Sequence, residues 1–139
     1  MPGNAQPPHE AEMRRAFEAW NAGDFDAWLA DAHPDFEYRP GIIVGPAEGE
    51  PIVYRGRDEL RRFFDEWHSA WRMKLTMDRT EQLGDWMLVL GRAQFTGLQS
   101  GASAEQEVGF IAQSEDGRVR RIWSYPTHEA AQAAAETAP

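Results

Sequence analysis

The sequence contains no cysteine among its 139 residues. Disulfide bonds, thiolate metal ligands and a cysteine nucleophile are therefore excluded. The histidines lack metal-site spacing, the acidic residues do not cluster as in a calcium loop, and neither a P-loop nor a G-x-S-x-G elbow occurs. We therefore expect no metal, no cofactor and no covalent serine chemistry.

Long apolar runs and an excess of positive charge are also missing. The formal net charge is −9, and the basic residues are scattered among acidic ones, which disfavours binding to nucleic acid or to anionic membranes. No apolar run approaches the length that spans a bilayer, and the first ten residues lack the basic start and apolar core of a signal peptide. We expect a cytoplasmic protein.

The composition, 42% apolar and 12% aromatic, is typical of one globular domain with a substantial core. We expect residues 1–9 to be disordered or extended and residues 10–136 to form a single domain. A Pro- and Gly-rich stretch at residues 40–51 is expected to be a loop inside that domain, because it is too broken for a strand.

The first half of the chain predicts three helices. The first runs from about Glu10 to Ala22 and ends at Gly23, where a left-handed cap is favoured. A short second helix begins after Asp24 as its cap and is closed by Pro34. The third covers about residues 57–71. The inward stripes of the three helices are expected to include Met13, Ala16, Phe17, Trp20, Phe25, Trp28, Leu29, Ala32, Leu60, Phe63, Phe64, Trp67 and Trp71.

The second half has the alternating pattern of strands. LTMDRTEQL and WMLVLGRAQF flank a Gly-Asp turn, and EQEVGFIAQ and RVRRIWSY flank Glu-Asp-Gly, so each pair predicts a β-hairpin. HPDFEYRP, residues 33–40, also alternates as a strand. The terminal THEAAQAAAE predicts a short, weakly docked helix. Helices followed by antiparallel strands indicate an α+β domain with helices on one face of a curved sheet.

Three segments carry a resemblance to a known family: FEAWNAGDFDAWLADAHPDFEYRP, YRGRDELRRFFDEWHSAW and SGASAEQEVGFIAQSEDGRVRRIWSYPTHEAAQAA. Together they resemble the SnoaL-like branch of the nuclear-transport-factor-2-like superfamily over nearly the whole chain. The resemblance implies a cystatin-like, cone-shaped sheet, antiparallel or mixed, which three N-terminal helices close around a pocket. It also implies a homodimer that forms through the outer sheet face. Because the family includes isomerases, cyclases, epoxide hydrolases, dehydratases and proteins without chemistry, function depends on the pocket residues.

The positions of the family's catalytic groups hold other residues in this sequence. In the ketosteroid-isomerase-like members, the base, the oxyanion tyrosine and the protonated acid align with Arg39, Ala16 and Gly109. An arginine stays charged and cannot abstract a proton. In the limonene-epoxide-hydrolase-like members, the Arg-x-Asp pair and the later Asp resemble Arg92, with Gln94 and Ser124 at the acid positions. An amide and a hydroxyl orient water but are poor acid-base groups near neutral pH.

The same alignment implies which residues of the strands face the pocket. It places inward Glu37, Arg39, Arg92, Gln94, Glu107, Gly109, Ile122 and Ser124. A buried carboxylate beside apolar rings gains basicity, so Glu107 and Glu37 are the candidate general bases. Arg92 and Arg39 are candidates to hold a ligand oxygen. Alternatively, these charges only form buried ion pairs with one another.

Six tryptophans are present. Trp20, Trp28, Trp67 and Trp71 lie on helix faces, either as plain core or as the lining of a pocket for a flat, mostly apolar ligand. Trp86 and Trp123 fall on strands and are expected on the outer sheet surface. Together with Tyr125 they predict an apolar patch that is suited to a homodimer.

Two functions of different class follow from these residues. The first is a protein that binds a small apolar or aromatic ligand without turnover, with Arg92, Arg39, Gln94, Ser124 and the four helix tryptophans as the ligand-binding residues. The second is a cofactor-free isomerase, cyclase or dehydratase with Glu107 or Glu37 as base and Arg92 as oxyanion partner. The state of the two carboxylates distinguishes these functions, since a free carboxylate in a cavity favours the enzyme.

Overall fold

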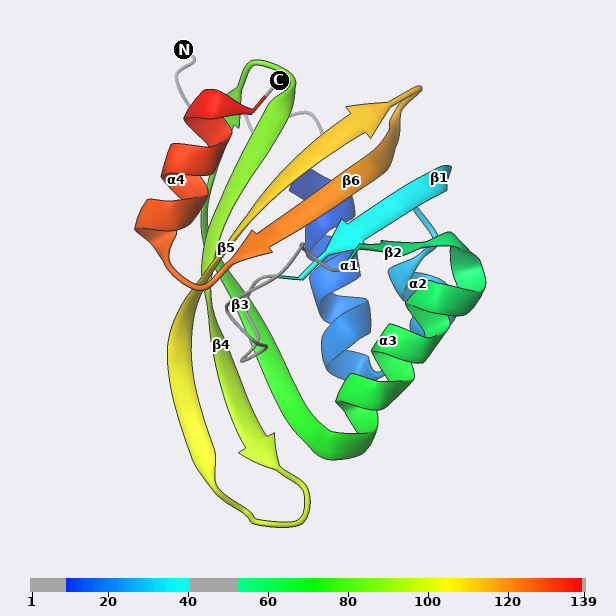
Figure 1. Cartoon of the computed structure of the whole chain (residues 1–139), viewed down its shortest axis with the longest axis vertical. Coiled ribbons are helices and arrows are strands. Elements are labelled where there is room, and N and C mark those ends of the chain that lie inside the picture. The colour runs from blue at the N-terminus through cyan, green and yellow to red at the C-terminus, as the bar shows by residue number, and fades with distance from the viewer. Residues whose placement is uncertain (1–9, 41–52, 139) are drawn as a thin grey trace.

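The computed structural model describes residues 10–40 and 53–138 of the chain (Figure 1). Six strands form one sheet in the order β2-β1-β6-β5-β4-β3. The helices are α1 (Glu10–Ala22), α2 (Phe25–Trp28), α3 (Gly56–Ala70) and α4 (His128–Thr137). The strands are β1 (Ala32–Arg39), β2 (Tyr54–Arg55), β3 (Trp71–Leu83), β4 (Trp86–Gly97), β5 (Ser103–Glu115) and β6 (Arg118–Tyr125). The predicted α+β class is confirmed. The expectations for residues 1–9 and for the loop at residues 40–51 concern positions outside the described residues, except for Pro40.

The N-terminal helices begin where the sequence predicts. Helix α1 covers Glu10–Ala22 and is followed by Gly23 with φ of 70°, a conformation that glycine adopts without strain. The Asp24 carboxylate accepts a hydrogen bond from the Ala27 backbone N–H at 3.1 Å and so caps α2. The predicted end at Pro34 is wrong, because α2 ends at Trp28 and Pro34 lies within β1.

The boundary between α3 and β3 differs from the predicted one by a single tryptophan. Leu60, Phe63 and Phe64 form the buried face of α3, as expected. Trp71 has extended backbone angles, φ −136° and ψ 145°, and begins β3 instead of ending the helix. Its indole therefore projects from the sheet and is 39% exposed.

Both predicted hairpins are present. Gly84 turns β3 into β4 with φ of 62°, and Asp116 and Gly117 turn β5 into β6 with φ of 54° and 77°. Positive φ at these positions matches the turn chemistry of tight hairpins. Strand β1 pairs parallel with β6, which makes the sheet mixed. In Figure 1 the long strands β3, β4 and β5 curve strongly, and α1, α2 and α3 lie on the concave side.

The sheet separates two apolar clusters. The larger one lies between the concave face and the first three helices. The smaller lies on the convex, outer face, where Trp86, Leu88, Leu90 and Ile111 pack against Ala131 and Ala135 of α4. None of the helices within the described ranges has the length and apolar content needed to cross a membrane.

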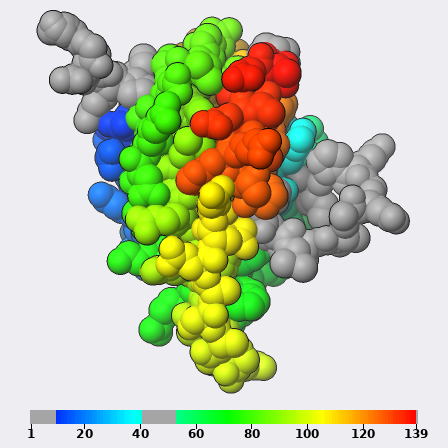
Figure 2. All heavy atoms as spheres, turned by 90° about the vertical axis from the view of Figure 1, so that its left-hand side faces the viewer, coloured from blue at the N-terminus to red at the C-terminus, as the bar shows by residue number. Residues whose placement is uncertain are grey.

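Helix α4 covers the outer patch that the sequence predicted for a partner subunit. Figure 2 shows α4, in orange and red, lying against the strands. Trp86 is on the outer face as expected but is only 2% exposed, and Ala131 is fully buried. The expectation of a weakly docked helix is therefore wrong. A homodimer through this face stays a prediction, and the apolar groups left for it are the partly buried Trp123 and Tyr125.

The close approach of α4 to the sheet depends on Gly109. A Cβ atom added at this glycine would lie 2.3 Å from the Ala131 Cβ, so the helix would have to move outward. We expect Gly109→Ala to lower the free energy of unfolding by about 1–3 kcal/mol, whereas Gly→Ala at an unstrained site is stabilising. Urea unfolding measures the change, with Ala133→Ser on the exposed side of α4 as control. A Gly109→Ala protein as stable as wild type would contradict this packing.

Candidate functional site

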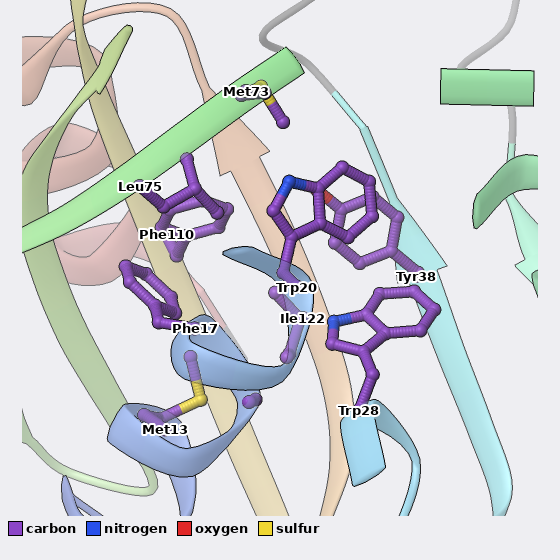
Figure 3. Close-up of a pocket in the computed structure, with 10 residues that line it drawn as sticks. Met13, Phe17, Trp20, Trp28, Tyr38, Met73, Leu75, Phe110 and Ile122 are labelled. Atoms are coloured by element: carbon purple, nitrogen blue, oxygen red, sulfur yellow. The ribbon is translucent and has the colours of Figure 1, made fainter. Parts of the chain in front are cut away.

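A small cavity lies on the concave side of the sheet, beneath α1 and α2 (Figure 3). Its volume is about 30 Å³, enough for one or two water molecules. It is lined by Met13, Ala16, Phe17, Trp20, Trp28, Tyr38, Met73, Leu75, Phe110 and Ile122. None of these side chains carries a formal charge at neutral pH, so the cavity is apolar, with polar atoms only on Tyr38 and the two indoles.

Helix α1 supplies one wall of the cavity, through residues that the sequence predicted to face inward. Met13, Phe17 and Trp20 follow one another at spacings of four and three residues and so share one face of the helix. The Asn21 side chain holds this helix against β3, because its amide donates to the Leu75 carbonyl at 2.9 Å and accepts from the Leu75 N–H at 2.8 Å. This pair of bonds fixes how far Trp20 reaches over the sheet.

Trp20 lies at the centre of an aromatic cluster. Its ring centroid is 5.5 Å from that of Trp28, 5.1 Å from that of Phe64 and 4.5 Å from that of His68. His68 also places a ring nitrogen 2.8 Å from the Trp20 carbonyl oxygen. The indole is 4% exposed, yet its Nε1–H has no hydrogen-bond partner in the described part of the chain. The cavity wall thus contains a buried donor that no atom of the described residues accepts from.

Tyr38 brings a hydroxyl to the cavity wall and hydrogen bonds to Ser124, which is buried but is not among the lining residues. Burial raises the pKa of Tyr38 to about 12, and its hydrogen bond with Ser124 opposes that shift only in part. Tyr38 therefore remains a neutral phenol at physiological pH. The Ser124 hydroxyl donates to the Arg39 carbonyl oxygen at 3.3 Å. Ser124 faces inward as predicted, and a ligand-binding role for it stays a prediction.

The four helix tryptophans separate into two groups. Trp20 and Trp28 line the cavity. Trp67 is partly buried against the same core, with its ring centroid 6.1 Å from that of Phe95, and it does not line the cavity. Trp71 packs edge-on to the same Phe95 from the exposed side. The structure thus brings two of these four predicted residues to the site.

The predicted facing of β1 is wrong. Phe36 and Tyr38 point into the concave core, while Glu37 and Arg39 lie on the outer face. The aromatic pair is drawn inward by Trp28, whose ring centroid lies 6.4 Å from that of Phe36 and 6.0 Å from that of Tyr38. A single-residue change of register exchanges the two faces of a strand. Each side chain of β1 that was predicted to face the pocket therefore lies on the outer face, and the reverse.

Glu37 is held in an ion cluster on the outer face. Its carboxylate accepts from Arg121 Nε at 2.7 Å and from Arg55 Nε at 3.1 Å. Arg121 also donates to the Gln113 side chain at 2.8 Å. Both oxygens of the proposed base are therefore engaged by guanidinium groups, outside the cavity.

The facing predicted for β4 is wrong as well. Ala93 and Phe95 pack into the concave core, so Arg92 and Gln94, at the alternate positions, lie on the outer face. Arg92 binds Asp78 through two nitrogens, at 3.0 and 3.1 Å, and these hydrogen bonds lower the pKa of the Asp78 carboxyl. Gln94 donates to Glu105 at 3.1 Å.

Glu107 and Arg39, the other charged residues that were predicted to line the pocket, also lie on the outer face, because their neighbours along the strands face the core. Val108 and Phe110 of β5 face the core, so Glu107, which precedes Val108, points outward. Its carboxylate accepts a hydrogen bond from the backbone N–H of His128, at the start of α4, at 2.9 Å. The Arg39 guanidinium lies 4.6 Å from the Trp123 ring centroid, a cation–π contact. Across residues 10–40 and 53–138, no group of three His, Asp or Glu side chains is placed to hold a metal ion.

Comparison with known proteins identifies the family. The model of the SnoaL-like domain matches residues 13–122. The chain belongs to the SnoaL-like family. None of the curated protein sequences is significantly similar to this SnoaL-like chain.

Solved structures share the fold at low sequence identity. An NTF2-like protein from Burkholderia pseudomallei has a TM-score of 0.74 and 23% identity, over 96% of this chain and 100% of its own. RV0760c from Mycobacterium tuberculosis, in complex with estradiol-17β-hemisuccinate, has a TM-score of 0.72 and 19% identity, over 86% and 94%. TerC, co-crystallised with polyporic acid, has a TM-score of 0.72 and 19% identity, over 94% and 100%. The nuclear-transport-factor-2-like fold of this SnoaL-like protein is thereby shown.

Proposed function

We propose that this SnoaL-like protein binds a small, largely apolar or aromatic molecule in the concave cavity and does not convert it. The observation that supports this proposal is the cavity itself, which the described residues wall with aromatic and aliphatic side chains. Ligand sites are concave and mostly apolar, with few polar groups. Two neighbours of the same fold hold small organic molecules, estradiol-17β-hemisuccinate in one and polyporic acid in the other.

Binding requires the cavity to widen, because about 30 Å³ is far below the volume of a drug-sized ligand. Met13 and Met73 are unbranched and flexible, so they repack at low cost. Among the lining residues with large side chains, Met73 and Trp28 are the two that are only partly buried. We propose that a ligand enters past these two side chains and occupies the space into which they now project.

The alternative is a cofactor-free isomerase, cyclase or dehydratase with Glu37 or Glu107 as general base. No carboxylate is among the ten side chains that line the cavity. Glu37 is bound by Arg55 and Arg121, and Glu107 of β5 accepts from the backbone N–H of His128 at the start of α4. A base has to reach the proton that it abstracts, and both carboxylates are on the opposite face of the sheet. We therefore propose binding without turnover.

A thermal-shift screen of neutral, flat aromatic molecules tests the binding proposal. A ligand at 100 times its Kd adds about 2.7 kcal/mol to the stability of the folded state, which for a domain of this size raises Tm by roughly 5–10 °C. Ala16→Phe places a ring in the cavity and is expected to abolish the shift. The same change at the exposed Ala133 of α4 is the matched control and should leave it intact. If no compound in such a screen raises Tm, the proposal is wrong.

A further inference from the structure

The indole N–H of Trp20 is the polar group in this structure whose presence is hardest to explain by folding alone. The side chain is 4% exposed, and Nε1 has no hydrogen-bond partner within the described residues. A buried donor without an acceptor costs free energy that a phenylalanine at the same place would avoid. Tryptophan N–H groups usually find a partner when they are buried. An acceptor that is not part of the protein chain would resolve this cost.

The direction of the indole is consistent with such an acceptor. In Figure 3 the nitrogen of Trp20 is on the edge of the ring that faces the gap toward Leu75 and Met73, both of which line the cavity. These two neighbours have no hydrogen-bonding oxygen in their side chains. The nearby Tyr38 hydroxyl is already paired with Ser124. The donor thus points toward apolar side chains, and no described residue accepts a hydrogen bond from it.

We propose, on the basis of the function proposed above, that Trp20 Nε1–H donates a hydrogen bond to an uncharged oxygen of the ligand. The chemical class is a flat aromatic or polycyclic molecule with a carbonyl oxygen of the ketone or quinone type. An indole donates one hydrogen bond and accepts none, so the matching ligand atom is an acceptor. Aromatic rings of the ligand would then stack among the side chains around Trp20.

No cation is present among the described residues that line the cavity, which disfavours a carboxylate as the acceptor. Transfer of an ionised carboxylate from water to an apolar site is costly unless a positive charge accompanies it. The arginines assigned to this role from the sequence are engaged elsewhere, Arg92 by Asp78 and Arg39 by the Trp123 ring. A neutral carbonyl loses far less hydration, and one N–H is enough to satisfy it.

A trapped water is the competing partner for the donor. A buried water makes about three hydrogen bonds, and a site needs two to four polar partners to hold it. The cavity has room for a water, and among the described residues its wall provides the Trp20 N–H, the Tyr38 oxygen and the Trp28 indole. The two indoles only donate, so the oxygen of a ligand carbonyl satisfies Trp20 as the oxygen of a water does and can replace it.

A matched pair of ligands tests the proposal on the wild-type protein. Fluorenone and fluorene have the same flat skeleton, and they differ in a carbonyl group against a methylene group. We expect fluorenone to bind roughly tenfold more tightly than fluorene, the factor for one satisfied buried donor. In ¹H–¹⁵N spectra the indole N–H resonance of Trp20 should move downfield with fluorenone and not with fluorene. Fluorene-9-carboxylate should bind more weakly than either.

Two variants assign the signal and provide the control. Trp20→Phe removes the resonance and should make the affinities for fluorenone and fluorene equal. Trp67→Phe, which removes an indole outside the cavity wall, should keep both the downfield shift and the tenfold preference. The wild-type ligand comparison remains decisive even if Trp20→Phe does not fold.

The outcomes separate this inference from the function on which it rests. Equal affinity for fluorenone and fluorene, with cavity resonances perturbed but the Trp20 indole unmoved, would overturn the inference and leave the binding function standing. Tighter binding of the carboxylate would overturn the uncharged acceptor. If neither neutral ligand perturbs the cavity resonances, both proposals are wrong.

Discussion

Trp20→Ala is expected to lower the free energy of unfolding by about 4 kcal/mol, within the range for deleting a buried tryptophan. The indole touches aromatic rings from two other helices, Trp28 of α2 and Phe63 and Phe64 of α3, with centroids 5.1 to 5.7 Å away. These rings surround it on more than one side, so the space cannot close without moving a helix. Urea unfolding monitored by circular dichroism measures the change.

Trp71→Ala is the matched control for this prediction. It removes the same side chain from a site that is 39% exposed and shares a ring contact only with Phe95 among the described residues. We expect a loss of about 1 kcal/mol, because much of the indole is hydrated in the folded state. Equal losses for the two variants would show that Trp20 is not the centre of the core.

Glu37→Ala is expected to lower the free energy of unfolding by about 3 kcal/mol. The Glu37 side chain is 11% exposed, and it is the shared acceptor for Arg121 and Arg55. Removing one member of a buried ion cluster leaves the others desolvated and unpaired. The loss lies at the low end of the range for such changes, because Arg55 is 68% exposed and regains water.

Glu105→Ala is the control, since its carboxylate is half exposed and contacts Gln94 and Arg92 at the surface. We expect less than about 0.5 kcal/mol for this exposed site. Ligand-induced thermal shifts should be the same in both variants as in wild type. A Glu37→Ala protein with full stability but lost ligand response would contradict the assignment of Glu37 to the outer face.

The elements of this fold were predictable because local chemistry specifies them. The apolar stripe of α1, the Asp24 cap and the glycines of both hairpin turns each act within a few residues, and all are present in the structure. Asp116 adopts positive φ together with Gly117 in the predicted Glu-Asp-Gly turn. The boundary between a helix and the following strand was harder to predict where a tryptophan suits either element, as Trp71 does.

The facing of the strands was not predictable to the same degree. HPDFEYRP alternates aromatic and charged residues, and the pattern alone does not say which set meets the helices. The contacts of Phe36 and Tyr38 with Trp28 decide it, and they arise between segments that only the tertiary fold brings together. On β4 and β5, small residues such as Ala93 and Gly109 interrupt the alternation of apolar and polar side chains, so the sequence alone does not show which face of these strands meets the core.

The close packing of α4 against the sheet could not be predicted from the sequence pattern either. Alanines give little apolar area, so the helix was expected to bind weakly. The structure shows that small size is what allows the contact, because Ala131 approaches Gly109 closely enough to bury both. The outer tryptophan Trp86 is thereby covered within the same chain.

The corrected facing changes the chemistry of the candidate site. With the charged residues on the outer face, the cavity has aromatic walls, a neutral tyrosine and one unpaired indole donor. On the proposed function, such a site discriminates by shape and by a single hydrogen bond, and none of the described residues that line it is a carboxylate or a histidine that would abstract a proton.

Crystals soaked with a set of small neutral aromatic ketones would show where a ligand binds. We expect electron density for the ligand between Trp20, Phe110 and Tyr38, with a carbonyl oxygen within hydrogen-bond distance of Trp20 Nε1 and with Met73 or Trp28 displaced. Ligand density confined to the outer face, beside Arg92 or Arg39, would contradict this expectation.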